Sequence, residues 1–487
     1  MRWGWAVAGG VGLTLLLRAP YLGSPLGVDE GGLAYIAQHW SQAGSSLYGN
    51  YWIDRPPLLL VLFKLAVLGG DLGVRFLGIL AAGALVVAVA LVTRTIAGER
   101  AGRVAALVAA VLSGSVAIHA VYTPGELLAV VPSTFSVLCL LRVLRRGRAR
   151  WLIGAGVLAV SAALIKQSFL DAGVAGAVFL MVCALRRDES GFRGSWPAAY
   201  LAGVAFPLLG LAAWEATARL QGGQLPYALL GFRLEALRAL ASNQGFASRL
   251  THLVLPALGS GLALAVVAAA LGLWRLRHQP IVALTLAAWL VAGCVGILAG
   301  GSYFSHYLIQ LVPGCSVTAA VLVADLQPRI RMRTLSAATF TACMVAIGGL
   351  VYLTQRSPYA QERQAAAFVR AHARTGDTQY VMYARANVLD YTGLPSPYPY
   401  AWSLMIRARP GAREQLYRLL ASPQRPTWLV QWQDDDTWRL DHANIVDRIL
   451  KARYRRVATV CGHPIYLRTG RPAPSPPRLD CGPITRH

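Results

Sequence analysis

Two adjacent carboxylates, Asp29 and Glu30, are the most chemically suggestive residues near the start of the chain. They precede Gly31 and Gly32 and an apolar, aromatic stretch that ends at Trp40, a pattern that predicts a helix. A carboxylate at a membrane surface can act as a base, because it can accept a proton from an attacking hydroxyl or amine. Asp before an apolar run is also a good helix N-cap. The two roles are compatible: Asp29 could cap while Glu30 acts, or the reverse.

Cationic side chains gather on the same side of the expected membrane, namely Arg55, Arg75, Lys166 and His306. The chain has only three lysines, so a lysine at position 166 is unusual for this protein. Arg can bind a phosphate through two parallel hydrogen bonds, whereas Lys binds it as a point charge. Each cation alone is better explained by a long side chain that reaches the lipid–water interface. Several cations beside paired carboxylates favour a site for an anionic lipid headgroup.

Two further polar positions lie at the predicted outer ends of apolar stretches. Glu126 begins one of them, where it could interact with the helix dipole or belong to a site. His306 and Tyr307 begin another, and a His at that depth could donate to a phosphate or bind a metal. An interfacial aromatic belt would also explain the tyrosine. A divalent cation held by Asp29, Glu126 and His306 is an open alternative, and no metal ligand is assigned.

The composition is that of a polytopic membrane protein. The chain has 487 residues, of which 55% are hydrophobic and only 14% are charged. A soluble protein of this size would have about 25% charged residues. The net charge of +24 does not indicate a nucleic-acid partner, because much of the excess lies in short loops where cytoplasmic Arg and Lys are expected. Phosphate-binding, zinc-protease and nucleophile-elbow motifs are absent, so no cytoplasmic nucleotide site is visible.

The apolar stretches predict eleven membrane spans and therefore an all-α membrane domain over residues 1–355. A span needs roughly 20 apolar residues. Residues 151–185 are the hardest case, because a single helix of that length would measure about 52 Å, too long for one crossing. Both flanks are basic, so the segment is expected to be a hairpin with Lys166 at its outer tip. The predicted spans are 3–19, 73–93, 104–121, 125–141, 151–165, 169–185, 197–215, 252–274, 279–299, 306–324 and 334–354.

Basic clusters orient these spans. Arginines concentrate at 94–103, 142–150, 186–193, 275–277 and 329–333, and we place all five clusters on the cytoplasmic side. The N-terminus is then cytoplasmic, in the plasma (inner) membrane. The outer side receives the first loop, residues 18–72, which carries the paired carboxylates, and the whole C-terminal part of the chain.

The C-terminal part predicts a small extracytoplasmic α/β domain over residues 356–470. Strands are expected at 380–383, 428–432, 455–460 and 464–467, and helices at 361–373, 413–420 and 444–451. Residues 471–487 are Pro-rich and are expected to be a flexible tail. Cys461 and Cys481 could form a disulfide in an oxidising compartment or remain free thiols.

The first loop resembles a known family. The VDEGG sequence followed by DRPPL is similar to the DE and (K/R)PPL motifs of the GT-C membrane glycosyltransferases, in particular the glycosyltransferase 39-like group of protein O-mannosyltransferases and aminoarabinose transferases. Further similar elements follow in the same order: the segment 72–77 around Arg75, the segment 163–166 ending at Lys166, and the segment 305–308 with Pro313. Each motif is short, but together they span roughly residues 12–325.

The resemblance implies a sugar donor linked to a polyprenyl phosphate and an inverting, single-displacement transfer of a hexosyl or pentosyl group. It implies Asp29 as general base, with Glu30 beside it. Two residues depart from the family pattern, since Arg55 stands where Lys is more usual and His306 where Arg is common. The implied donor-binding residues, for phosphate or sugar, are Arg55, Arg75, Lys166, His306 and Tyr307. Glu126, at the outer start of its span, is a further candidate for the same site.

Two other functions use similar residues. A transporter or flippase of lipid-linked sugars would also need polar groups in a cavity, but it would usually carry them at mid-membrane and show internal repeats. A cell-envelope glycan polymerase or ligase would differ only in its acceptor. The acceptor itself, whether a protein, a lipid or a glycan, is not readable from the sequence, and neither is the sugar.

Overall fold

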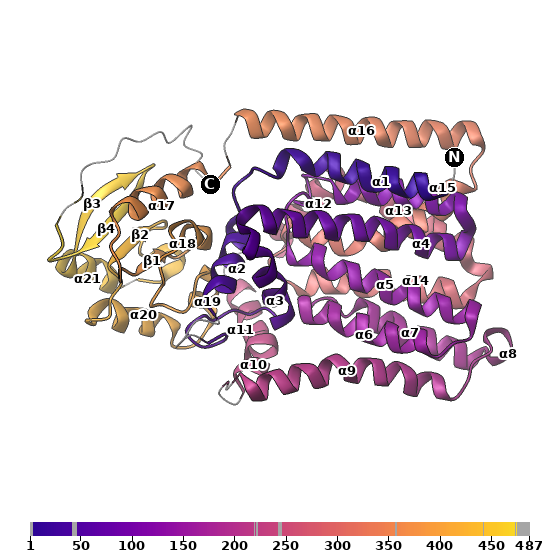
Figure 1. The fold of residues 1–487 in the computed structure, drawn as a ribbon, viewed down its shortest axis with the longest axis horizontal. Coiled ribbons are helices and arrows are strands. Elements are labelled where there is room, and N and C mark those ends of the chain that lie inside the picture. Colours follow the sequence, from indigo (N-terminus) through magenta and orange to yellow (C-terminus); the bar gives the residue numbers. More distant parts are fainter. Residues whose placement is uncertain are drawn as a thin grey trace.

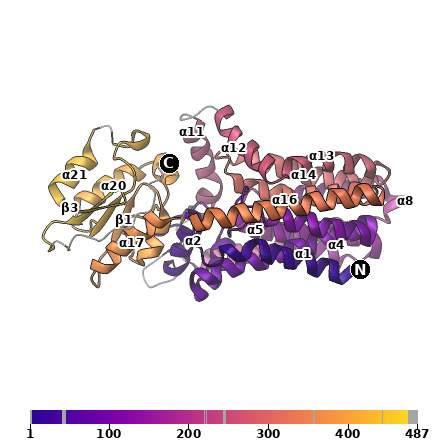
Figure 2. The ribbon, with the colours of Figure 1, turned by 90° about the horizontal axis from the view of Figure 1, so that it is seen from above.

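A computed structural model describes residues 3–40, 46–218, 220, 223–241, 246–355, 358–441, 443–472 and 474. Helices run side by side along one long bundle, and a smaller domain that contains the β-strands lies beyond one end of it (Figure 1). The N-terminus and the short helix α8 (Arg187–Ser190) lie at the opposite end (Figure 1). A view from above gives the same arrangement, with α16 running along the bundle (Figure 2).

The bundle helices follow the apolar stretches of the sequence, because in a bilayer the backbone polar groups must be satisfied within the helix. Helix α4 contains a reversal, since Ala97 and Gly98 have non-helical backbone angles and Gly102 packs against the carbonyl of Ala90. The helices are α1 (Trp3–Arg18), α4 (Gly70–Ser113), α5 (Gly125–Arg146), α6 (Arg150–Ile165), α7 (Asp171–Leu185), α9 (Ser195–Thr217), α12 (Phe246–Gly259), α13 (Leu262–Arg275), α14 (Pro280–Ala299), α15 (Val312–Ala324) and α16 (Pro328–Gln355).

One predicted span differs from the structure. Residues 252–274 were expected to form a single helix, but the chain breaks near Gly261 and the two parts are bent by 84°. Gly261 has a φ of 76°, a conformation that few residues other than glycine adopt readily. Within the described residues, five helical stretches are long and apolar enough to cross a membrane, or up to six with the bent pair as one span. The number of eleven crossings therefore stays a prediction.

The predicted hairpin is present. Helix α6 ends at Ile165, α7 begins at Asp171, and Lys166 lies in the turn between them. Short helices surround this end of the bundle: α2 (Val28–His39), α3 (Pro57–Ala66), α10 (Gln224–Pro226), α11 (Phe232–Ala241) and the 3₁₀ helix η5 (Ser305–Leu311). Helix α2 carries Asp29 and Glu30, and η5 carries His306 and Tyr307.

The C-terminal domain holds a four-stranded sheet in the order β1-β2-β4-β3. Strands β1 and β2 are parallel, and the other neighbours are antiparallel. Buried Tyr380, Trp428 and Ile465 contribute to its core. The elements are α17 (Ala360–His372), β1 (Gln379–Met382), α18 (Ala386–Thr392), α19 (Ser403–Ala408), α20 (Ala412–Ala421), β2 (Trp428–Gln431), α21 (Ile445–Arg453), β3 (Tyr454–Val460) and β4 (His463–Arg468).

The predicted fold class is confirmed: a helical membrane domain with a small C-terminal α/β domain. Each predicted strand and helix of this domain has a counterpart within a few residues. The domain boundaries stay a prediction, and most of the Pro-rich tail lies outside the described residues. Cys461 is part of a disulfide, whereas Cys481 lies outside the described residues.

Candidate active site

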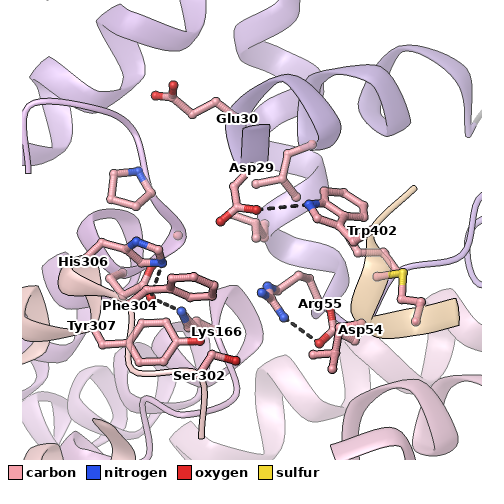
Figure 3. A pocket seen from close by; sticks show the side chains of 18 of the residues that line it. Asp29, Glu30, Asp54, Arg55, Lys166, Ser302, Phe304, His306, Tyr307 and Trp402 are labelled. Carbon is pink, nitrogen blue, oxygen red and sulfur yellow. Dashed lines mark hydrogen bonds and ion pairs between the residues drawn. The ribbon is translucent and has the colours of Figure 1, made fainter. Parts of the chain in front are cut away.

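A cavity of about 200 Å³ lies at the end of the bundle that faces the C-terminal domain. Its walls come from segments that are far apart in the sequence, which only the fold brings together. Side chains from the first loop, the Lys166 turn, α11, η5 and α19 line it (Figure 3). The polar and charged side chains among them are Asp29, Glu30, Asp54, Arg55, Thr123, Glu126, Lys166, Arg233, Ser302, His306, Tyr307, Trp402, Ser403 and Arg407.

Asp29 and Glu30 point in different directions from α2 (Figure 3). Asp29 lies in the first turn and is exposed, and its Oδ1 accepts a hydrogen bond of 3.1 Å from the indole Nε1 of Trp402. Its carboxylate points into the space bordered by Arg55, Lys166 and His306 (Figure 3). Asp29 therefore has an oxygen available to a substrate in the cavity.

Glu30 is buried, with 4% of its surface exposed, and its oxygens are already engaged. Oε2 accepts a hydrogen bond of 2.9 Å from the backbone N–H of Gly27, the N-cap of α2. Oε1 accepts one of 2.6 Å from the N–H of Thr123 and one of 2.5 Å from Arg75. Of the two roles that the sequence left open, capping therefore falls to Glu30, which leaves Asp29 free to act.

Arg75 occupies a different place from the one expected. It is 2% exposed and is not among the residues that line the cavity. Besides Glu30, it donates to the carbonyl oxygens of Ser24 and Pro25, and its guanidinium lies over the ring of Tyr122. In this structure the donors of Arg75 hold the chain around α2, and its role in binding the donor phosphate stays a prediction.

Lys166 does reach the cavity, together with Glu126, His306 and Tyr307. Its Nζ donates to Oε1 of Glu126, and the His306 Nε2 lies 3.5 Å from the same oxygen. The Lys166 ammonium also lies 4.4 Å from the centre of the Tyr307 ring. Burial lowers the pKa of Lys166 to about 8, although Glu126 acts in the opposite direction. The four residues come from α5, the α6–α7 turn and η5.

A second cluster of charged side chains lines the cavity: Asp54, Arg55 and Arg233. Arg233 was not among the residues predicted from the sequence. Asp54 Oδ2 lies 2.7 Å from a guanidinium nitrogen of Arg55 and 3.0 Å from one of Arg233. Burial raises the pKa of Asp54, but the two arginines outweigh it and hold that pKa below its ordinary value. For Arg55, burial acts to lower the pKa, yet Asp54 raises it above the ordinary range. Asp54 therefore bridges both guanidinium groups at this wall of the cavity.

Comparisons with known proteins show which families and folds this chain resembles. Residues 54–214 match the family described as dolichyl-phosphate-mannose-protein mannosyltransferase. The fold aligns with ArnT from Cupriavidus metallidurans bound to undecaprenyl phosphate, at a TM-score of 0.64 and 17% identity over 96% of this chain and 98% of that one. The apo state of the same protein gives a TM-score of 0.68 at 15% identity over 95% and 97%. The chain therefore shares the overall fold of ArnT.

A more distant structure with a similar fold is the Archaeoglobus fulgidus oligosaccharyltransferase in complex with Zn and sulfate. The TM-score there is 0.57 at 12% identity, over 92% of this chain and 71% of that one. No curated protein sequence gives a significant match. The resemblance predicted from the short motifs is thus confirmed at the level of the fold.

A possible metal site can be assessed only among the residues that the structure describes. No group of three or more His, Cys, Asp or Glu side chains there could hold a metal ion. Glu126 and His306 do approach each other, but Lys166 lies against the same Glu126 oxygen. In this structure Glu126, Lys166 and His306 form a cluster of interacting ionisable side chains.

Proposed function

We propose that this protein transfers a sugar from a polyprenyl-phosphate donor to an acceptor on the extracytoplasmic side of the membrane. The observation that carries the proposal is the cavity whose lining combines the available carboxylate of Asp29 with the cations Arg55, Lys166 and Arg233. Fixed cations beside a free carboxylate suit a reaction in which an anion leaves as a proton is removed. The bound undecaprenyl phosphate of the ArnT structure supports a lipid phosphate as that anion.

The proposed reaction is a single displacement with inversion. The acceptor hydroxyl or amine attacks the anomeric carbon as the bond between that carbon and the lipid phosphate oxygen breaks. Asp29 accepts the acceptor's proton. Arg55, Arg233 and Lys166 stabilise the charge that grows on the leaving phosphate, and this stabilisation is larger in the transition state than in the ground state. Neither a nucleotide nor a covalent enzyme intermediate is required.

The proposed site faces outward in the inner membrane. The arginine clusters that indicate the cytoplasmic side and the residues of the cavity fall at alternate ends of the predicted spans. The donor would therefore be presented on the outer leaflet, and the acceptor would arrive from the extracytoplasmic space. Which sugar and which acceptor are used is the first thing that an experiment has to identify.

Purification with native lipid provides that experiment. We expect mass spectrometry of the purified protein to detect a polyprenyl phosphate carrying a sugar, and we expect the sugar to be transferred in extracts of cell-envelope acceptors.

Replacing Asp29 by Asn should lower kcat by about 100- to 10,000-fold, the usual contribution of a general base, while donor binding is kept. Asp71→Asn is the matched control, because Asp71 is an exposed carboxylate at the same end of the bundle.

The rival functions give different results. A flippase would move a labelled polyprenyl-phosphate sugar across proteoliposomes without forming a glycosylated product, and Asp29→Asn would not change that movement. A glycan polymerase or ligase would show the same dependence on Asp29 but would form a glycan–glycan product. Full turnover by Asp29→Asn would contradict the proposed base.

A further inference from the structure

The C-terminal domain contributes a residue to the candidate base. The indole of Trp402, which precedes α19, donates to Asp29 Oδ1 across 373 positions of sequence (Figure 3). Within the described residues, no hydrogen bond to the second oxygen, Oδ2, is recorded for this carboxylate. One oxygen is therefore held by the protein and the other faces the cavity.

This contact depends on a close approach between α2 and the C-terminal domain. A side chain at Gly32 would collide with the Trp402 ring, and one at Gly31 would come within 2.6 Å of Asn387 Cβ. The Gly31-Gly32 pair that follows the two carboxylates therefore gives α2 a flat face against α18 and Trp402. The absence of side chains there brings the indole within hydrogen-bond distance of Asp29.

Other contacts hold the same interface in register. The Tyr391 hydroxyl donates to the Leu26 carbonyl oxygen at 2.6 Å, just before α2 begins. The backbone N–H of Ser396 donates to the hydroxyl of Tyr35, in the middle of α2, at 2.7 Å. A third contact lies outside α2, where the N–H of Trp52 donates to the carbonyl oxygen at position 399 at 3.2 Å. Trp402 is thus supported by a docked domain rather than by an isolated loop.

We propose that Trp402 is a positioning residue for Asp29, and that the C-terminal domain completes the catalytic centre by supplying it. The inference rests on the proposed function. An exposed Asp in the first turn of a helix can adopt several rotamers, and only some of them would direct an oxygen to an acceptor in the cavity. The indole N–H fixes one oxygen, which aims the other at the acceptor's proton.

The chain offers a matched pair of variants. Trp428 in β2 makes a hydrogen bond of the same kind and length, 3.1 Å from its Nε1 to Asp377 Oδ2, away from the cavity. Trp402→Phe and Trp428→Phe each remove one indole-to-aspartate bond from the same domain. We expect Trp402→Phe to lower kcat about 10- to 100-fold with an unchanged KM for the donor, as for a lost hydrogen bond to a charged group. Trp428→Phe should keep kcat per folded molecule within about twofold, because it acts at a distant site.

A conservative variant separates positioning from packing. Trp402→His retains a ring N–H donor and should recover part of the kcat that Trp402→Phe loses. Equal loss of kcat in the Phe and His variants, or equal kcat in Trp402→Phe and Trp428→Phe, would overturn the proposal. A change confined to the KM for the donor would also overturn it, because the role would then be in binding.

A second measurement does not depend on transferase activity. In a double-mutant cycle of thermal unfolding, Trp402→Phe should lower the midpoint in the wild-type background but much less in an Asp29→Ala background, since the hydrogen bond is already lost there. Additive effects would overturn the contact. If the cycle shows coupling but the wild-type protein transfers no sugar, the proposed function fails while the contact stands.

Discussion

Two buried ion clusters lie at the same end of the bundle and differ in their charge balance. The Glu30 cluster pairs one carboxylate, Glu30, with one guanidinium, Arg75, and both are surrounded by backbone donors and acceptors. The cavity cluster places three cations, Arg55, Arg233 and Lys166, against two carboxylates, Asp54 and Glu126. The first is neutral and internally satisfied, whereas the second has one positive charge in excess, with His306 counted as neutral.

This difference in charge balance indicates that the Glu30 cluster is structural and that the cavity cluster can bind an anion. A neutral, fully hydrogen-bonded pair gains nothing from an outside ligand and has no free donor to offer. An excess of fixed cations that open onto a cavity is stabilised when an anion enters. The comparison also explains why two adjacent carboxylates are assigned different roles, because Glu30 belongs to the neutral cluster and Asp29 faces the cationic one.

Of the substitutions that test the difference between the two clusters, Glu30→Gln should have the largest effect on stability. The change leaves Arg75 charged and buried without its partner, which should cost about 3–5 kcal/mol of the free energy of unfolding. We expect a large drop in the thermal midpoint and in the yield of folded protein. Asp29→Asn should leave the midpoint near that of the wild type, because Asp29 is exposed. A stable Glu30→Gln protein that has lost turnover would reverse the two assignments.

The pH dependence of donor binding tests whether Lys166 contributes its positive charge to the cavity cluster. Burial lowers the pKa of Lys166 to about 8, so its positive charge is present below that pH and is lost as the pH rises through it. Donor affinity should therefore fall about 10- to 100-fold on the alkaline side, the range for one hydrogen bond to a charged group. Lys166→Arg should keep its affinity there, because a guanidinium remains charged.

The measurement is a titration of donor affinity from about pH 6 to pH 10. Lys451→Arg is the control, since Lys451 is exposed in the C-terminal domain and pairs only locally with Asp447. An alkaline loss of affinity that persists in Lys166→Arg would assign it to another group and would remove Lys166 from the proposed phosphate site.

Much of the fold follows from patterns that are local in the sequence. Apolar stretches bounded by arginines predict helices in the bilayer, and the basic flanks of residues 151–185 predict the hairpin that brings Lys166 to the cavity. The break at Gly261 could not be foreseen in the same way. A glycine inside an apolar run is compatible with a straight helix, and only packing against neighbouring helices decides that it bends.

The division of roles in the site was only partly predictable. Glu30 follows Gly27 by three positions, the spacing at which a glutamate side chain reaches back to the N-cap. That pattern was available in the sequence, but it depends on the helix starting at Val28 rather than after Asp29. Arg233 and Trp402 had no such local signal, because each reaches the cavity only through tertiary contacts.

The last and smallest effect that we expect is a pH-dependent change in how α2 docks against the C-terminal domain. Gln38 near the end of α2 donates to Asp390 Oδ1 at 3.2 Å, and burial, with a contribution from Asp71, raises the pKa of Asp390 to about 8. Because this pKa lies above the ordinary value of about 4, the contribution of Asp390 to stability is fully present below pH 4 and is lost as the pH rises through 8. The domain should dock less firmly in alkaline solution.

Comparing the wild type with Asp390→Asn isolates this carboxylate, since every other titrating group is common to both. The two thermal midpoints should be close at pH 5 and should diverge by pH 9, with the variant the more stable. A constant difference at all pH values would contradict the assignment.

Gln38 and Asp29 lie on the same helix, so weaker docking should also loosen the Trp402 contact. Above pH 8, the wild type should then lose more kcat than Asp390→Asn, which would link the stability of the junction to the placement of the base.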